Sequence, residues 1–558
     1  MCGSSSSRPR AGCRLTPRQL VAGGLTALTI PALVVGPPQG TLVTLWPSAL
    51  AIALAFITRN IFGALFLGAL AGSVLLARGS PWQTGATLVG DALVPAVTTP
   101  WNIGVLTFTL LIGGLVALLE AGDGMAVVAR RLQRHAQGRR GAGLAIYAIG
   151  WLFFVDGLGN AMLVGKTMRP IADRAGISRA KLAFIVDTTA SPIASVAFVS
   201  TWVAYEISVI REGFANVGPA IAQVAAPYGA LIASLPYRFY PYFILLIALL
   251  AVLGRDIGPM RAHERAVQDT TGDRPGGSDV EAGGGSLVLA LAPLLILLVT
   301  VVGGLWIDGG GAGRPVTVAS LIETLGQADA ARVFVWATGL TIGLTIGLMR
   351  LEPGTSRHTR ELVAVAISGI GTMGRPALIL ILAWMLNGVI QQLDAASYLV
   401  ELLTGRLPAA LVPTSVFALA ALMSFSTGTS WGTMAMVMPL AIPLAFALSG
   451  PTVTAATAGD PLVTSTIGAV LAGAVFGDHC SPISDTTIVS AFSTGCEVMT
   501  HVQTQLPYAL MAGVLAIVCG YLPAGFGVSP WLLLPSGGAA CWLWIRVASR
   551  APDRDREA

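Results

Sequence analysis

Charged residues are scarce in this chain of 558 residues. Asp, Glu, Lys and Arg together make up 11% of the sequence, whereas hydrophobic residues make up 54%. Soluble globular domains carry about 25% charged residues, so the composition excludes that class. It predicts an all-α polytopic membrane protein.

Lysine and cysteine are rare as well. Lys166 and Lys181 are the only lysines, so almost all cations are arginines, and these lie in short loops beside apolar runs. The net charge of +5 therefore reflects orientation in the bilayer and does not indicate nucleic-acid binding. The six cysteines, at positions 2, 13, 480, 496, 519 and 541, form no framework, and we expect free thiols.

Apolar runs of roughly 17–25 residues predict about 12 transmembrane helices, which we orient by placing arginine-rich loops in the cytoplasm. Both termini are then cytoplasmic, and the first apolar run is a signal anchor because no cleavage site follows it. The predicted order is a tail at 1–19, a first membrane half at 20–255, a cytoplasmic linker at 256–286, a second half at 287–546 and a tail at 547–558. The linker prediction depends on a Gly-, Asp- and Arg-rich run, which is typical of flexible segments.

Two hydrophobic segments are interrupted by short polar breaks. The segment 143–172 lies between two basic loops, whereas the segment 411–448 lies between loops with few cations. A segment with both ends on one side of the membrane is most simply a re-entrant hairpin, so we predict one hairpin from each side. The expected tip residues are Asp156, Asn160, Ser426, Thr427, Thr429 and Ser430.

Each predicted hairpin is followed by an apolar segment that contains the sequence Ser-Pro-Ile. Proline lacks a backbone N–H and disfavours helix just before it, so carbonyls near it lose their helical donors. We therefore predict broken helices at 182–210 and 466–494. Matching hairpin to hairpin shifts the chain by five spans, an odd number that inverts the second copy. Inverted repeats with broken helices are a recurrent architecture of secondary transporters, with ion sites at the breaks.

The breaks also carry carboxylates at membrane depth, where each ionisable residue costs at least ~2.5–3.5 kcal/mol. Carboxylates, hydroxyls and free carbonyls together suit a small hard cation. We predict that Na⁺ binds at Asp478 and Asp485, and that a proton competes with it, because burial disfavours the charged carboxylate whereas a cation favours it. The predicted ion-binding and proton-coupling residues are Asp478, Asp485, Asp187, Ser481, Ser484, Ser191, Ser195 and Thr188.

Several residues allow a second interpretation. Asp478 and Asp485 would also serve as caps at a helix break, and Asp156 as a turn former. Lys166 either pairs with an internal carboxylate or extends to the membrane interface, and Glu206 is expected near the outer interface. The neighbours His479 and Cys480 would suit a transition metal or a Cys–His nucleophile, but adjacent residues rarely converge on one atom, and we favour neither.

The run Gly-Asp-His-Cys-Ser-Pro-Ile-Ser-Asp at 477–485, with Thr-Gly-Cys at 494–496 and the segment that begins at His501, closely resembles the signature of the NhaC family of sodium/proton antiporters. Weaker matches lie at 168–173, 254–260 and 426–434, so the resemblance covers about Leu144 to Leu510. It implies a cation/proton antiporter, and related branches exchange organic acids such as malate and lactate. The family often carries a second acidic residue beside position 156, where this chain has Gly157.

We therefore expect a secondary antiporter of the cell inner membrane that exchanges Na⁺ for H⁺ by alternating access. The alternative is an Na⁺- or H⁺-coupled exchanger of small organic acids; a channel or an intramembrane enzyme is less favoured. The absence of a Walker sequence argues for transport driven by an ion gradient. We expect no cofactor and no nucleic acid as a partner, and the sequence leaves open a homodimer, the ion selectivity and the stoichiometry.

Overall fold

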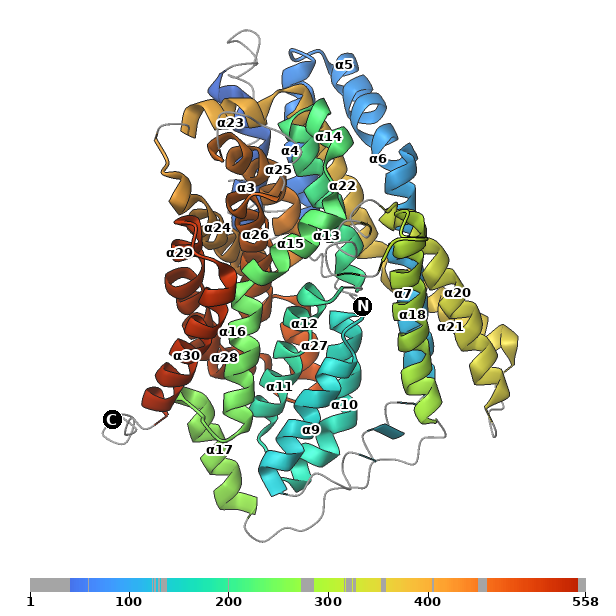
Figure 1. Ribbon diagram of the computed structural model, residues 1–558, viewed down its shortest axis with the longest axis vertical. Coiled ribbons are helices and arrows are strands. Elements are labelled where there is room, and N and C mark those ends of the chain that lie inside the picture. Colours follow the sequence, from blue (N-terminus) through green and yellow to red (C-terminus); the bar gives the residue numbers. More distant parts are fainter. Residues whose placement is uncertain are drawn as a thin grey trace, which may run out of the picture.

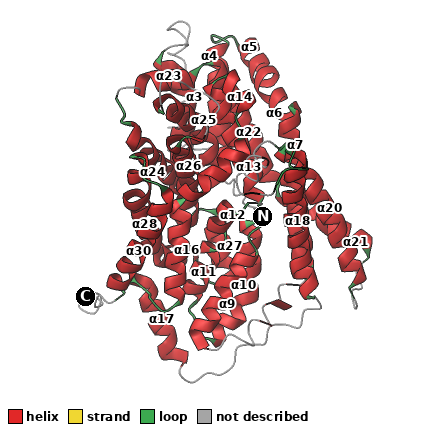
Figure 2. Ribbon diagram, in the orientation of Figure 1, coloured by secondary structure: helices red, strands yellow, loops and turns green. Residues whose placement is uncertain are grey.

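A computed structural model of the chain describes residues 41–549 except 59, 123, 125–126, 129–130, 132–137, 199, 272–285, 316, 318–323, 325–327, 353–357, 404–405 and 450–458. The described residues form helices joined by loops, with no strand among them (Figure 2). The predicted N-terminal tail, the first predicted span, residues 272–285 of the linker and most of the C-terminal tail lie outside the described residues. The all-helical class is confirmed.

Eight helices in the described part of the chain are long and apolar enough to cross a membrane. Two further pairs pass the same test together but bend by 47° and 46°, which gives up to ten spans. The spans are α7 (Pro100–Ala121), α18 (Leu287–Asp308), α20 (Ala330–Leu351), α22 (Gly374–Gln392), η4 with α24 (Ala409–Thr427), α25 (Ser430–Leu448), α26 (Pro461–Cys480) and the continuous run from α28 through η6 to α29 (Val498–Gly525). The protein is therefore a multi-pass membrane protein, and the number of about 12 spans stays a prediction.

Apart from α9 to α13 and α27, whose bounds follow below, further helices complete the described chain, and α15 with η3 and α16 forms one of the two bent pairs. In chain order they are η1 (Leu42–Leu45), α3 (Trp46–Thr58), α4 (Ile61–Leu76), α5 (Pro81–Ala86), η2 (Thr87–Leu93), α6 (Val94–Thr98), α14 (Pro219–Val224), α15 (Pro227–Ser234), η3 (Leu235–Tyr237), α16 (Phe239–Val252), α17 (Gly258–Thr271), α21 (Thr359–Thr372), α23 (Ala395–Leu403) and α30 (Pro530–Ala548). Helices α3 and α4 were predicted as full spans, but they contain 13 and 16 residues. At about 1.5 Å per residue, both are shorter than a hydrocarbon core of about 30 Å.

Two helical hairpins approach the centre of the molecule from opposite ends (Figure 1). We call α9 (Gly138–Leu152) with α10 (Gly157–Arg174) hairpin 1, and α24 (Val412–Thr427) with α25 hairpin 2. Hairpin 1 lies in the lower half of Figure 1 and hairpin 2 in the upper half. This opposition agrees with inverted repeats, while the re-entrant course through a membrane stays a prediction.

The break of the second repeat lies where the sequence predicts it. Helix α26 ends at Cys480, and α27 (Asp485–Thr494) begins after the interruption Ser481–Ser484. The tip of hairpin 2 packs on this break, because the Ser481 hydroxyl donates to the carbonyl of Phe425 at 2.8 Å. Gly428 at the tip has a left-handed φ of +69°, and a Cβ there would lie 2.7 Å from the Ile483 carbonyl oxygen, so only glycine fits.

The first repeat differs from the prediction because it is interrupted twice. Helices α11 (Arg179–Thr188), α12 (Ser191–Val196) and α13 (Thr201–Val217) follow one another. The tip of hairpin 1 contacts both interruptions, since Asn160 donates to the Thr189 carbonyl at 2.7 Å and the Thr201 amide donates to the Val155 carbonyl at 2.8 Å. Ser-Pro-Ile begins α12 in the first repeat, whereas it lies in the interruption between α26 and α27 in the second.

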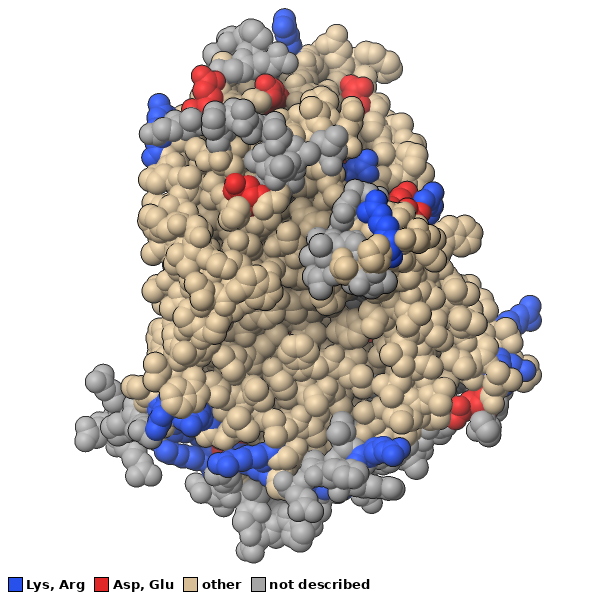
Figure 3. Space-filling view, in the orientation of Figure 1, with Lys and Arg blue, Asp and Glu red and all other residues tan. Residues whose placement is uncertain are grey.

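Each hairpin packs against the broken helix of the other repeat. Helix α10 of hairpin 1 contacts α27, and α25 of hairpin 2 contacts α13. The two repeats are therefore interlocked, with their breaks facing each other near the centre (Figure 1). In Figure 3, arginine and lysine side chains gather along the lower edge, below a wide and mostly uncharged belt. Such a belt is the expected surface of a protein in lipid.

Candidate functional site

Asp478 lies in the last turn of α26, directly before the second-repeat break, and its side chain is 5% exposed. Three hydroxyls donate to its carboxylate: Ser484 at 2.8 Å, Ser191 at 3.0 Å and Thr486 at 3.3 Å. Ser191 comes from α12 of the first repeat, whereas the other two flank the start of α27. Both repeats therefore hold this one carboxylate.

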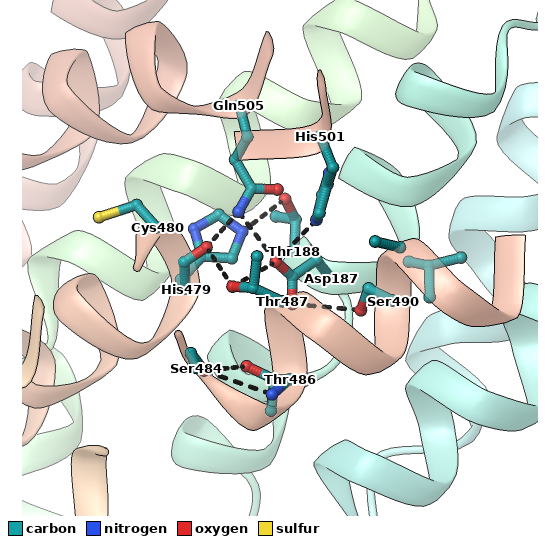
Figure 4. Close-up of polar contacts among 12 residues, drawn as sticks. Asp187, Thr188, His479, Cys480, Ser484, Thr486, Thr487, Ser490, His501 and Gln505 are labelled. Carbon is teal, nitrogen blue, oxygen red and sulfur yellow. Dashed lines mark hydrogen bonds and ion pairs between the residues drawn. The ribbon is translucent and has the colours of Figure 1, made fainter. Parts of the chain in front are cut away.

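Asp187 is the second carboxylate of the centre and is fully buried at the end of α11. It accepts hydrogen bonds from Gln505 Nε2 at 2.8 Å and Ser490 Oγ at 3.2 Å, and it lies 3.2 Å from His501 Nε2 (Figure 4). Thr487 Oγ1 is a longer donor at 3.4 Å. All four partners belong to α27 and α28 of the second repeat.

His479 lies between these groups and follows Asp478 in the chain. One ring nitrogen is 3.0 Å from Thr188 Oγ1 (Figure 4). The other is 2.7 Å from the Tyr240 hydroxyl, so the imidazole is held from both sides. Gln505 also donates to the His479 carbonyl. We call Asp187, Asp478, His479, His501, Gln505 and the hydroxyls that contact them the central cluster.

The central cluster contains no fixed cation of the lysine or arginine type. Among the described residues, the one ion pair of Asp187 is with His501, which carries charge only when protonated, and Asp478 has none. Elsewhere the protein pairs a buried carboxylate with a permanent cation: the Arg238 guanidinium donates two hydrogen bonds, of 3.2 and 3.0 Å, to the Glu206 carboxylate. Two buried carboxylates without such a partner favour binding of a proton or a mobile cation.

Five of the eight predicted ion-site residues lie in the central cluster, namely Asp478, Asp187, Ser191, Ser484 and Thr188. The others do not join it. Asp485 starts α27 with an exposed side chain, Ser481 donates to the Phe425 carbonyl, and Ser195 donates to the Pro192 carbonyl at 2.9 Å. The structure thus brings Asp187, and not Asp485, together with Asp478 as the buried pair.

Two other charged residues can now be placed in the structure. Lys166 is exposed on α10, so of its two alternatives the structure excludes a buried partner of an internal carboxylate. Glu206 is 1% exposed and paired with Arg238, while its expected depth near the outer interface stays a prediction. The sequence shows a charge in an apolar run but not the helix face on which it lies.

The predicted tip residues mostly stabilise the hairpins. Asp156 caps α10 by accepting from the Gly159 amide at 2.7 Å, and it also accepts from Thr201 Oγ1 at 2.9 Å. Asn160 donates to the carbonyls of Gly150 and Thr189, at the interruption between α11 and α12, and its own Oδ1 is a buried acceptor without a protein partner. In hairpin 2, Thr429 caps α25, Ser430 is buried in its first turn, and Ser426 and Thr427 bond back to their own helix.

The sequence did not single out most of the donors to Asp187. His501 and Gln505 are four residues apart, so they share one face of α28. Two polar residues at that spacing in an apolar helix are the signal that would have found them. Among the described residues, no group of three or more His, Cys, Asp and Glu side chains is arranged to hold a metal ion, so a cation here would rely on hydroxyls and carbonyls beside the carboxylates.

These features are those of a secondary transporter: two hairpins that approach from opposite ends, broken helices, and buried carboxylates at the breaks. The chain belongs to the Na⁺/H⁺ antiporter family, whose sequence profile matches residues 193–526, more than half of the chain. Its members are transporters and not enzymes.

Relatives extend the comparison over nearly the whole chain. An uncharacterised protein of Haemophilus influenzae is 34% identical over 494 residues, which are 87% of this chain and 91% of that protein. The Malate-2H(+)/Na(+)-lactate antiporter of Bacillus subtilis is 31% identical over 149 residues, 22% of this chain and 30% of that protein. An uncharacterised Na(+)/H(+) antiporter of Haemophilus influenzae is 34% identical over 117 residues, 20% of this chain and 22% of that protein.

Two solved transporters have a distantly similar structure. The YdaH transporter of Alcanivorax borkumensis is 13% identical, with a TM-score of 0.47, over 81% of this chain and 90% of that one. MtrF of Neisseria gonorrhoeae is 13% identical, with a TM-score of 0.49, over 85% of this chain and 94% of that one.

Proposed function

We propose that this protein exchanges Na⁺ for H⁺ across the cell inner membrane by alternating access, with the central cluster as the shared binding site. The observation that carries the proposal is the pair of buried carboxylates, Asp187 and Asp478, without a lysine or arginine partner. Membership of the Na⁺/H⁺ antiporter family supports the same ions.

The geometry explains why one ion would displace the other. A bound cation favours ionised Asp478 and is attracted by Asp187, and the oxygens of Ser484 and Thr486 beside it are hard ligands. When the cation leaves, a proton neutralises the buried charge, whose desolvation is costly. The hydroxyls rotate to donate to a carboxylate or to accept from a carboxylic acid, so both states keep their hydrogen bonds.

The breaks offer a route for alternating access. Each break contacts the tip of one hairpin, through the Ser481–Phe425 bond in the second repeat and the Thr201–Val155 bond in the first. Because the hairpins enter from opposite ends, movement of one tip would open the cluster to one side only. The basic lower edge in Figure 3 supports a cytoplasmic position for the lower end of the molecule, where hairpin 1 lies.

A second candidate is coupled exchange of small organic acids, which the similarity to the malate/lactate antiporter favours. A carboxylate substrate would need a cationic partner. The fully buried Arg238 is such a cation in the described core, and Glu206 already holds it. The structure therefore supports the ion exchanger better than the organic-acid exchanger.

Transport in proteoliposomes with an imposed sodium gradient tests the proposal. We expect proton counterflow in the absence of any organic acid, and no further increase when malate or lactate is added. Proton movement that requires malate or lactate would instead establish the second candidate. A passive sodium current without coupled protons would reject both.

A further inference from the structure

A carboxylate outside the central cluster lies where hairpin 2 meets α22. Glu212 is on α13, partly buried, and accepts a hydrogen bond from the side-chain amide of Asn387 on α22. The Asn387 oxygen accepts from Asn216 Nδ2 at 3.0 Å, and Asn216 also donates to the Pro439 carbonyl on α25 at 2.9 Å. Three helices are thus joined by one chain of hydrogen bonds.

The position of this chain follows from the prolines of α25. In a helix the Pro439 carbonyl would accept from the residue four positions later, but that residue is Pro443, which has no N–H. Asn216 supplies the missing donor. Helices α13 and α25 also touch closely at Gly213, where a Cβ would lie 2.5 Å from Ile442 Cδ1. The two helices therefore act as one packed unit against α22.

The direction of the hydrogen bonds favours an ionised Glu212. The amide of Asn216 donates to Asn387, which fixes the Asn387 oxygen as an acceptor and points its NH₂ group at the Glu212 carboxylate. A hydrogen bond to a charged acceptor is stronger than one to a neutral acceptor. Protonation of Glu212 would therefore weaken the link between α13 and α22.

Few charges surround Glu212. Arg211 beside it in the chain is its attractive charge, and that guanidinium stacks over the Trp101 ring of α7 at 4.5 Å from the ring centre. No ion pair to Glu212 occurs among the described residues. The other ionisable side chains on helices that pack against α13 are Glu120 on α7, Tyr228 on α15, Arg375 on α22, and Tyr398 and Glu401 on α23; α12, α14 and α25 carry none.

We propose that Glu212 is a second proton-binding residue of the transport cycle, separate from the central cluster, and that its ionised form ties the α13–α25 unit to α22. An ionisable residue inside a membrane bundle is expensive to keep and marks ion or proton pathways. Protonation releases the tie and frees hairpin 2 to move against α22. The part in transport rests on the proposed exchange, whereas proton binding at Glu212 does not.

Glu212→Gln tests the inference, because Gln still accepts from Asn387 but does not titrate. In purified wild-type protein, infrared spectroscopy should detect a carboxyl stretch whose pH titration coincides with the pH dependence of the exchange rate in proteoliposomes. Glu212→Gln should lack that stretch and show a flattened pH profile, while sodium binding to the central cluster stays within about twofold of wild type. Glu401→Gln, the same change at an exposed glutamate of α23, is the control and should keep both signals.

Asn387→Asp keeps the test decisive if Glu212→Gln fails to fold. A second carboxylate opposite Glu212 should move the midpoint of the carboxyl titration to higher pH by about one unit or more, since like charges disfavour ionisation. An unchanged titration in Asn387→Asp, or a wild-type carboxyl signal and pH profile in Glu212→Gln, overturns the inference even if exchange is normal. The two proposals can fail separately. If the wild-type protein moves no protons with sodium, while the carboxyl signal is present in wild type and lost in Glu212→Gln, the proposed function is overturned and the proton site at Glu212 stands.

Discussion

Asp187→Asn is the sharpest test of the central cluster. The substitution keeps the size of the side chain but removes its charge and sets an amide NH₂ among the donors Gln505 and His501. Two unit charges about 4 Å apart attract by about 4 kcal/mol at an effective dielectric constant of about 20. Because each ~1.4 kcal/mol is a factor of ten, loss of this attraction should weaken sodium binding roughly a thousandfold.

The matched control is Asp485→Asn, which makes the same chemical change at the exposed start of α27. Sodium affinity from calorimetry, and sodium-driven proton flux in proteoliposomes, should change at most a few-fold in this variant. The sequence alone predicted Asp485 as a sodium ligand together with Asp478. Near-wild-type sodium affinity in Asp187→Asn, or equal losses in the two variants, would refute the assignment of Asp187 to the ion site.

Three further results are expected. Sodium binding should release protons, so the heat of binding should depend on the ionisation enthalpy of the buffer, and lower pH should raise the apparent KM for sodium. Asp478→Asn should reduce the proton release. A heat of binding that does not depend on the buffer would contradict competition of sodium and protons for one site. Gly428→Ala should lower the free energy of unfolding by about 1–2 kcal/mol and thereby lower the thermal unfolding temperature. Gly90→Ala is the control and should leave that temperature unchanged, because the added Cβ meets open space. A cysteine at Arg179 should be labelled from the cytoplasm and a cysteine at Ser449 from outside. Labelling of both positions from the same side of the membrane would contradict the inverted hairpins.

Local sequence was enough to locate the second-repeat break and its carboxylate. Pro482 prevents a regular helix there, and the apolar residues of α26 place Asp478 in the interior whatever its neighbours are. The two hairpins and the inverted order of the repeats were also visible, because they depend on loop charge and on breaks in apolar runs.

The membership of the site required the three-dimensional structure. Asp485 is seven residues after Asp478, but the interruption between them resets the helical phase, so spacing along the chain no longer tells which face Asp485 occupies. Asp187 meets donors 300 or more positions later, among them Gln505 at a separation of 318 residues. No local pattern records such a contact, and the same holds for the pairing of Arg238 with Glu206.

The interlocked repeats also constrain how the protein is made. During synthesis the first repeat enters the membrane with Asp187 but without α27 and α28, which carry the donors to that carboxylate found among the described residues. Until about 300 further residues have been inserted, the nascent chain must shelter an unsatisfied acid in lipid or keep α11 near water. A chain that ends before α27 would keep that defect permanently, and the cell's membrane proteases would have a local feature by which to recognise it.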